Sequence, residues 1–222
     1  MHQTVTNFNK IKNLIKTNQE KTNNKNNIKI IAVSKTFEIS HINPLIEYGH
    51  TDFGENKVQE AVEKWSSIKT KNTNLSLHLI GKLQSNKTKL ALRIFDYIHS
   101  LDSEKLANKI SEEQKKLEKR PKLFIQVNIG NEEQKSGIEP DSLKSFYKYC
   151  VDKDLNVIGT MCLPPISEDP EKYFKRMYYL NNDLGLNELS MGMTADYIPA
   201  IENNSTYIRI GTKIFGEREK KI

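Results

Sequence analysis

The stretch KLFIQVNI, residues 122–129, is a nearly continuous apolar run rather than an alternation of apolar and polar residues. A strand with this pattern is buried on both faces, as in a parallel sheet that is covered by helices. Seven other short runs of similar character are spread along the chain. The eight runs that we expect to form strands are 28–34, 51–53, 75–80, 97–101, 122–129, 156–163, 188–191 and 207–210.

The segments between these runs have helical periodicity, which is clearest in residues 103–119. Leu106, Ile110 and Leu117 share one helical face there, and Glu and Lys cover the other. Eight repeats of strand and helix predict an α/β fold in which a (β/α)8 TIM barrel closes on itself. An open doubly wound sheet is the alternative. Residues 28–222 are fewer than the ~250 typical of such barrels, so we expect short loops.

An additional helix is expected before the first strand. Phe8, Ile11, Leu14 and Ile15 recur at helical spacing, and the pattern ends in a polar run at 23–27. We therefore predict an N-terminal helix and polar loop in residues 1–27, followed by a single barrel domain in residues 28–222.

Composition excludes several classes of protein. The 222 residues include 34 Lys+Arg and 28 Asp+Glu, a net charge of +6, but the lysines are scattered along the chain, which favours a solvated surface over a nucleic-acid-binding patch. No apolar run approaches the ~20 residues of a membrane span, and the first residues lack the apolar core of a secretory signal. Cys150 and Cys162 form neither a disulfide framework nor a zinc motif, and we expect Cys162 to pack in the interior rather than to act as a redox-sensitive thiol. These features predict a cytoplasmic protein with no metal, membrane or nucleic-acid partner.

The residues that follow the apolar runs are candidate site residues, because active sites of (β/α)8 barrels lie at the carboxyl ends of the strands. The first run, IKIIAVSK at 28–35, ends in Lys35. A lysine held at a rigid, partly apolar strand end loses its charge more readily than a surface lysine and can then attack an aldehyde as an amine. The alternative is an ordinary solvated lysine.

Three other residues near strand ends allow two interpretations each. Asn56, in FGEN at 53–56, either offers its amide to a ligand or caps the next helix. His78, in HLIGKLQSNK at 78–87, is either a structural residue or a base. Lys135, in QVNIGNEEQKSGI at 126–138, is either a loop charge, which we favour slightly, or a second amine.

Glycine and hydroxyl side chains follow the last two strands. SMGMTAD at 190–196 contains Thr194, and RIGTKIFGER at 209–218 contains Arg209, Gly211 and Thr212. Phosphate sites in these barrels are commonly built from the loops after strands seven and eight and a helix N-terminus. Together with Lys35, these loops predict a site for a phosphorylated aldehyde, and pyridoxal phosphate is the obvious candidate.

The motifs AVSKT, FGENKVQE, HLIGKLQSNK, QVNIGNEEQKSGI, LSMGMTADY and IRIGTKIFGER occur in order along nearly the whole chain. In these motifs the sequence resembles the pyridoxal phosphate homeostasis proteins, single-domain relatives of the alanine racemase N-terminal barrel. The resemblance implies that Lys35 holds pyridoxal 5'-phosphate as a Schiff base and that Arg209 faces the pyridine nitrogen. The other cofactor-binding residues it implies are Thr194, Gly211 and Thr212 at the phosphate, Asn56 beside the ring, and His78, Ser190 and Met193.

The sequence departs from the family pattern at three places. Thr194 stands where the family usually has serine, and the stretch GTMCLPP at 159–165 replaces more apolar residues. Pro199 lies five residues after Thr194, where we expect a helix to begin. A proline at that depth should remove one hydrogen bond and bend the helix.

The resemblance favours a carrier of pyridoxal phosphate over an enzyme. Arg209 can only donate hydrogen bonds, so it favours the unprotonated pyridine nitrogen, and the ring is then a poorer electron sink. Racemases that resemble this barrel use a tyrosine from another domain as a second base, and we expect no such domain in a chain ending at Ile222. We therefore predict a monomer that holds the cofactor for homeostasis or delivery to apo enzymes, with no catalytic residues. A weak racemase-like enzyme is the alternative.

Overall fold

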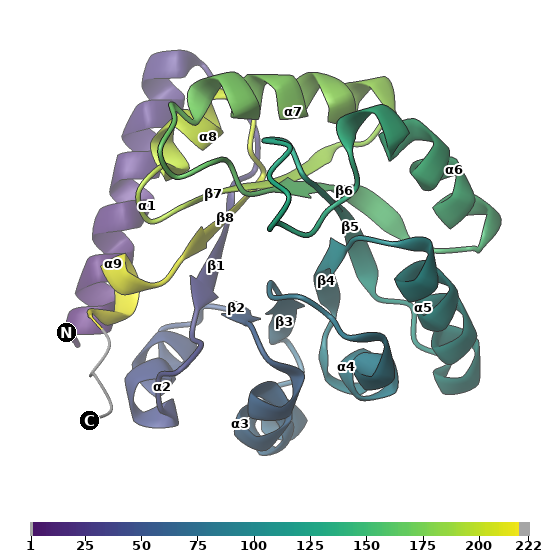
Figure 1. Cartoon of the computed structure of the whole chain (residues 1–222). Helices are drawn as coiled ribbons and strands as arrows, with labels where there is room; N and C mark the ends of the chain where they lie inside the picture. The colour runs from purple at the N-terminus through teal and green to yellow at the C-terminus, as the bar shows by residue number, and fades with distance from the viewer. Residues whose placement is uncertain (1, 218–222) are drawn as a thin grey trace.

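A computed structural model describes residues 2–217 and contains a closed barrel of eight parallel strands (Figure 1). Each strand pairs with the next one along the chain, and β8 pairs with β1. The (β/α)8 fold predicted from the apolar runs is confirmed, and the doubly wound alternative is excluded. The strands are β1 (Lys29–Val33), β2 (Asp52–Glu55), β3 (Ser76–Leu79), β4 (Tyr97–Leu101), β5 (Lys122–Val127), β6 (Val157–Cys162), β7 (Glu188–Met193) and β8 (Tyr207–Ile210).

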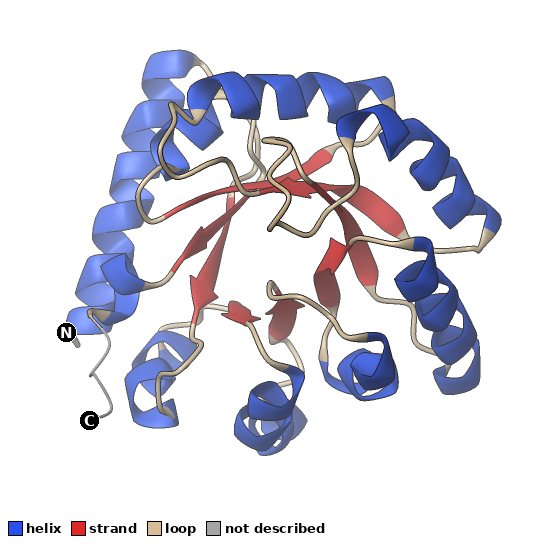
Figure 2. Cartoon of the chain, in the orientation of Figure 1, coloured by secondary structure: helices blue, strands red, loops and turns tan. Residues whose placement is uncertain are grey.

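Helices form an outer layer around the strands (Figure 2). The described helices are α1 (Gln3–Thr22), α2 (Ile39–Glu47), α3 (Val58–Lys71), α4 (Thr88–Ile94), α5 (Glu104–Leu117), α6 (Leu143–Asp152), α7 (Glu171–Asp183), α8 (Tyr197–Glu202) and α9 (Thr212–Phe215), with short 3-10 turns at Ser85–Lys87 and Pro140–Ser142. Within residues 2–217, none of these helices combines the length and the apolar character that crossing a membrane requires.

Helix α5 begins and ends at residues whose conformations stop the helix, and its buried face matches the predicted spacing. Ser103 is the N-cap, and its hydroxyl accepts a hydrogen bond from the backbone N–H of Leu106. Glu118 ends the helix in a left-handed conformation with φ 52°. The buried face contains Leu106 and Ile110, as the spacing predicted.

Helix α1 is longer than the periodic pattern suggested and lies along α8 and α9 (Figure 1). Its buried face contains Phe8 and Ile11, and the Asn7 side chain donates to the carbonyl of Ile214 over 3.1 Å. The extra N-terminal helix is therefore confirmed. The division of the chain at residue 27 stays a prediction, and residues 218–222 of the expected barrel domain lie outside the described residues.

The interior of the barrel contains aromatic and imidazole rings. His78 stacks on Tyr97 with ring centroids 4.2 Å apart, and His99 stacks on Phe124 at the same separation. Both histidines are fully buried. Apolar side chains fill the space around them and belong to Ile31, Tyr97, Phe124, Met161 and Tyr207.

Burial keeps the interior histidines neutral. It lowers the pKa of His78 against the opposing effect of Asp52, and it lowers the pKa of His99 well below the ordinary value. His50, packed between the rings of Phe8 and Phe53, has its pKa lowered by burial to about 4. A neutral imidazole is the form that a low-dielectric interior favours.

We expect the free energy of unfolding to fall as the pH drops from 6.5 towards 4. The unfolded chain takes up protons on these histidines near pH 6.5, whereas folded His50 does so only near pH 4. The unfolded state thus binds more protons within this window, so stability rises with pH there. Urea titrations at several pH values measure the effect, and His50→Phe should reduce it. A stability that stays constant between pH 6.5 and 4.5 would contradict the prediction.

Candidate functional site

Lys35 lies just after β1, at the carboxyl-end mouth of the barrel, and its side chain is partly buried. Carboxylates from the second strand–helix unit hold the backbone on both sides of it. The Ser34 hydroxyl donates to Glu55 Oε1 over 2.7 Å, and the Thr36 backbone N–H donates to Glu60 Oε1 over 2.7 Å. The strand end that carries Lys35 therefore has a defined position.

Lys64 joins these two carboxylates, and we call Glu55, Glu60 and Lys64 the Lys64 clamp. Its Nζ lies 3.0 Å from Glu55 Oε1 and 3.1 Å from Glu60 Oε1, and it donates to the Ser34 carbonyl over 3.0 Å. The Lys64 side chain is only 10% exposed and that of Glu55 is fully buried, so water screens their attraction weakly. The i,i+4 spacing of Glu60 and Lys64 on α3 is a pattern in the sequence from which this ion pair can be predicted.

The clamp also supports a strained turn. Thr36 has φ 68°, a left-handed conformation that β-branched residues rarely adopt. Such a conformation costs roughly 1–3 kcal/mol and persists only where the surroundings enforce it. The bond from Thr36 to Glu60 supplies that enforcement. Partial burial acts to raise the pKa of Glu60, but the hydrogen bond from Thr36 and the nearby Lys64 ammonium hold it below its ordinary value.

Asn56 follows β2 and is partly buried at the same mouth. Its backbone packs against Gly81 in the loop after β3, where a Cβ would lie 2.3 Å from the Asn56 carbonyl oxygen. Only glycine permits this close approach. The glycine of HLIGKLQSNK thus sets the distance between the loops that follow β2 and β3.

The two predicted hydroxyls at the ends of β7 and β8 lie together. The Thr212 hydroxyl donates to Thr194 Oγ1 over 3.5 Å, and Gly211 is the N-cap of α9. A Cβ at Gly211 would lie 3.4 Å from the Val33 carbonyl oxygen, two residues before Lys35. The structure therefore places the paired hydroxyls next to the strand end that carries Lys35, and this arrangement of donors suits a phosphate group.

The helix after β7 starts later than expected, and this changes the position of Pro199 within it. Helix α8 begins at Tyr197, not at Thr194, because Asp196 Oδ1 accepts the backbone N–H of Met193 over 2.6 Å and holds a turn before the helix. Pro199 therefore lies in the first turn, where no intrahelical partner for its nitrogen is needed. The predicted loss of a hydrogen bond is wrong. Met193 is 40% exposed beside this turn.

Arg209 projects from β8 into the interior and is 4% exposed. Its Nη1 donates to Ser190 Oγ over 2.6 Å, and its Nη2 donates to the Cys162 carbonyl over 3.0 Å. Burial lowers the pKa of the guanidinium, and it raises the pKa of the Cys162 thiol to about 12. Cys162 is completely buried, as expected for a packing residue.

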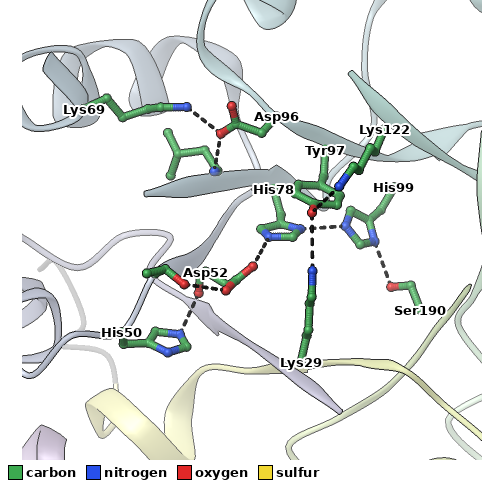
Figure 3. Close-up of polar contacts among 12 residues, drawn as sticks. Lys29, His50, Asp52, Lys69, His78, Asp96, Tyr97, His99, Lys122 and Ser190 are labelled. Carbon is green, nitrogen blue, oxygen red and sulfur yellow. Dashed lines mark hydrogen bonds and ion pairs between the residues drawn. The ribbon is translucent and has the colours of Figure 1, made fainter. Parts of the chain in front are cut away.

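His78 is fully buried within β3, and its ring lies between the side chains of His99 and Asp52 (Figure 3). Its Nδ1 is 3.0 Å from His99 Nε2, and its Nε2 is 3.1 Å from Asp52 Oδ1. Both ring nitrogens thus have protein partners. No local pattern in the sequence marks Asp52 or His99 as partners of His78, because the three side chains meet only inside the closed barrel.

Lys135 is engaged within its own loop region. Its ammonium forms an ion pair with Glu132 and donates to the carbonyls of Leu163 and Pro164. These contacts agree with the interpretation of Lys135 as a loop charge. The roles of all the predicted site residues toward a ligand remain predictions.

Comparison with known proteins identifies the family. The family described as "Alanine racemase, N-terminal domain" matches residues 7–219. The chain is 41% identical over 212 residues to the "Pyridoxal phosphate homeostasis protein" of Haemophilus influenzae, with 90% of this chain and 89% of the relative covered.

Solved structures agree with this assignment. PipY of Synechococcus elongatus, whose structure has been solved with PLP bound, is 32% identical, with a TM-score of 0.79 over 91% of this chain and 100% of PipY. An alanine racemase of Clostridium difficile shares the fold alone, with 15% identity and a TM-score of 0.69 over 93% of this chain and 57% of the racemase. The chain belongs to the alanine racemase N-terminal domain family and, within it, to the pyridoxal phosphate homeostasis proteins.

Proposed function

We propose that this protein binds pyridoxal phosphate reversibly as a Schiff base on Lys35 and serves in cytoplasmic homeostasis and delivery of the cofactor. The observation that carries the proposal is the position of Lys35, whose strand end is held by the Lys64 clamp beside the paired hydroxyls of Thr194 and Thr212. The printed names of the relatives and the PLP-bound structure of PipY support it.

Each residue of the candidate site has a distinct part in binding the cofactor. Pyridoxal phosphate supplies an aldehyde that condenses with an amine and a ring that accepts electrons. The hydroxyls of Thr194 and Thr212 and the backbone N–H of Gly211 bind the phosphate. Arg209 donates toward the pyridine nitrogen, and Asn56 lies beside the ring. Lys35 is partly buried and supplies the amine.

We propose that the protein carries out no strong catalytic turnover with the cofactor. Arg209 carries only donors, so it cannot stabilise a protonated pyridine nitrogen and leaves the ring a weak electron sink. We propose further that the protein acts as a monomer and transfers the cofactor to apo enzymes in transient contacts. Washout of deuterium from the Cα of amino acids, with Lys35→Ala as the blank, separates this carrier from a weak racemase.

Mixing the purified protein with pyridoxal phosphate should produce a visible absorption band that borohydride converts into a stable label on Lys35. Peptide mapping by mass spectrometry locates the label. Lys35→Ala should abolish the band, whereas Lys135→Ala, which removes an amine already held by Glu132, should keep it. A label distributed over many surface lysines would refute a specific site.

Removal of the clamp carboxylate should weaken cofactor binding. Glu60→Ala deletes the acceptor for the Thr36 N–H, and we expect the dissociation constant of pyridoxal phosphate to rise roughly tenfold, since a hydrogen bond to a charged group is worth ~1.5–3 kcal/mol. Absorbance titration measures this constant. Glu63→Ala, an exposed carboxylate on the same helix, is the matched control. Equal affinities in the two variants would show that the clamp does not position Lys35.

Thr212→Val should reduce the affinity for pyridoxal phosphate by about tenfold while leaving the affinity for pyridoxal unchanged, because only the phosphate uses the hydroxyl. Thr212→Ser retains the hydroxyl and should bind both ligands as the parent does. Titrations of the three proteins with each compound test the assignment. A parallel loss for both ligands would place the phosphate elsewhere.

A further inference from the structure

A continuous chain of hydrogen bonds crosses the barrel interior from Arg209 to Asp52. Arg209 Nη1 lies 2.6 Å from Ser190 Oγ, which lies 2.8 Å from His99 Nδ1. His99 Nε2 lies 3.0 Å from His78 Nδ1, and His78 Nε2 lies 3.1 Å from Asp52 Oδ1. Figure 3 shows the part from Ser190 to Asp52. We call these five residues the interior chain.

The Asp52 end of the interior chain determines the direction of the bonds in it, because the carboxylate can only accept and both buried imidazoles are neutral. Arginine has no acceptor, so Ser190 Oγ accepts from Arg209, and its own proton is available for His99 Nδ1. A neutral imidazole that accepts at Nδ1 carries its proton on Nε2. His99 therefore donates from Nε2 to His78 Nδ1.

The same rule applies to the second imidazole. His78 accepts at Nδ1, so it carries its proton on Nε2 and donates to the Asp52 carboxylate, which can only accept. If every bond ran in the opposite direction, a neutral His78 would carry its proton on Nδ1. Its unprotonated Nε2 would then face the Asp52 carboxylate with no proton between them, unless His78 were charged. Complete burial opposes that charge.

The interior chain also connects two opposite charges. Among the described residues, the only hydrogen-bond partners of the Arg209 guanidinium are Ser190 Oγ and the Cys162 carbonyl, both uncharged. A buried charge without a partner is costly. The charge of Asp196 acts on Arg209 from outside the interior chain and raises the pKa of the guanidinium against the effect of burial. Asp52, whose side chain is 18% exposed, is the negative end of the interior chain itself, and Thr51 donates a hydrogen bond to its other oxygen over 2.8 Å. Hydrogen bonds that all run in one direction polarise one another, and this strengthens each bond of the interior chain.

We propose that Ser190, His99, His78 and Asp52 are positioning residues that orient Arg209 toward the cofactor through two histidines, both protonated on Nε2. The inference rests on the proposed function for the role of Arg209 toward the cofactor. The interior chain and the tautomers of its two histidines are properties of the protein without ligand. It assigns His78 an indirect action on the cofactor, since its two ring nitrogens form their hydrogen bonds, within residues 2–217, with His99 and Asp52.

Nitrogen-15 NMR of the ligand-free protein at pH 7.5 tests the tautomers directly. Long-range proton–nitrogen spectra should show His78 and His99 as neutral rings, each with a protonated Nε2 and an unprotonated Nδ1. A proton on Nδ1 of either ring, or a charged ring, would overturn the proposal.

Two variants test the coupling. Ser190→Ala should merge the separate Nη1 and Nη2 signals of Arg209, because one side of the guanidinium loses its acceptor. Asp52→Leu should allow His99, two hydrogen bonds away, to carry a proton partly on Nδ1. Asp96→Asn is the matched control, since Asp96 also raises the pKa of His78 electrostatically but lies outside the interior chain, and its spectra should keep both tautomers. If Asp52→Leu does not fold, Asp52→Ser removes the charge with less bulk.

Unchanged spectra of His99 in the Asp52 variant and of Arg209 in Ser190→Ala would refute the positioning role. The visible band with pyridoxal phosphate is recorded separately on the same samples. Absence of that band from a parent protein with the stated tautomers would count against the proposed function, while the interior chain would stand.

Discussion

The pairing of β1 with β8 is the contact on which the candidate site depends. It places Ile31 opposite Arg209 and Ala32 opposite Ile210, and thereby brings the first strand of the chain beside the last. Gly211, just after β8, then packs against Val33, two residues before Lys35. A slip of one residue in this pair would exchange the side chains that face the interior for those that face the helices. Closure and register together therefore create the site.

Within that framework, the burial of charged groups decides which side chains are held in place. The carboxylate of Glu55 is fully buried and accepts from Ser34, Lys64 and Trp65. Arg209 is nearly as buried and has two acceptors of its own. Removing such groups from water is unfavourable unless they are hydrogen-bonded. The bonds that lower this cost also restrict the geometry, so the same contacts support stability and position the strand ends.

Local patterns explain why much of the fold was predictable. Each apolar run predicted a strand buried on two faces, and the spacing of Leu106 and Ile110 predicted the buried side of α5. The error at Pro199 has a local cause as well. The side chain of Asp196 binds the Met193 N–H and delays the start of α8, a competition between side-chain and helical hydrogen bonds that hydrophobic periodicity does not register.

The barrel, the order of its strands and the place of Lys35 after the first strand could all be predicted from the apolar runs, and the ordered motifs indicated the family. Three contacts became visible only in the folded barrel: Thr194 meets Thr212, Lys64 joins two carboxylates around Lys35, and His78 binds His99 and Asp52. The difference lies in the range of the interactions along the chain. Hydrophobic periodicity is formed by residues close together in the sequence, and it predicts which face of a helix or strand is buried. Partners from different strands are chosen by the register and closure of the whole barrel.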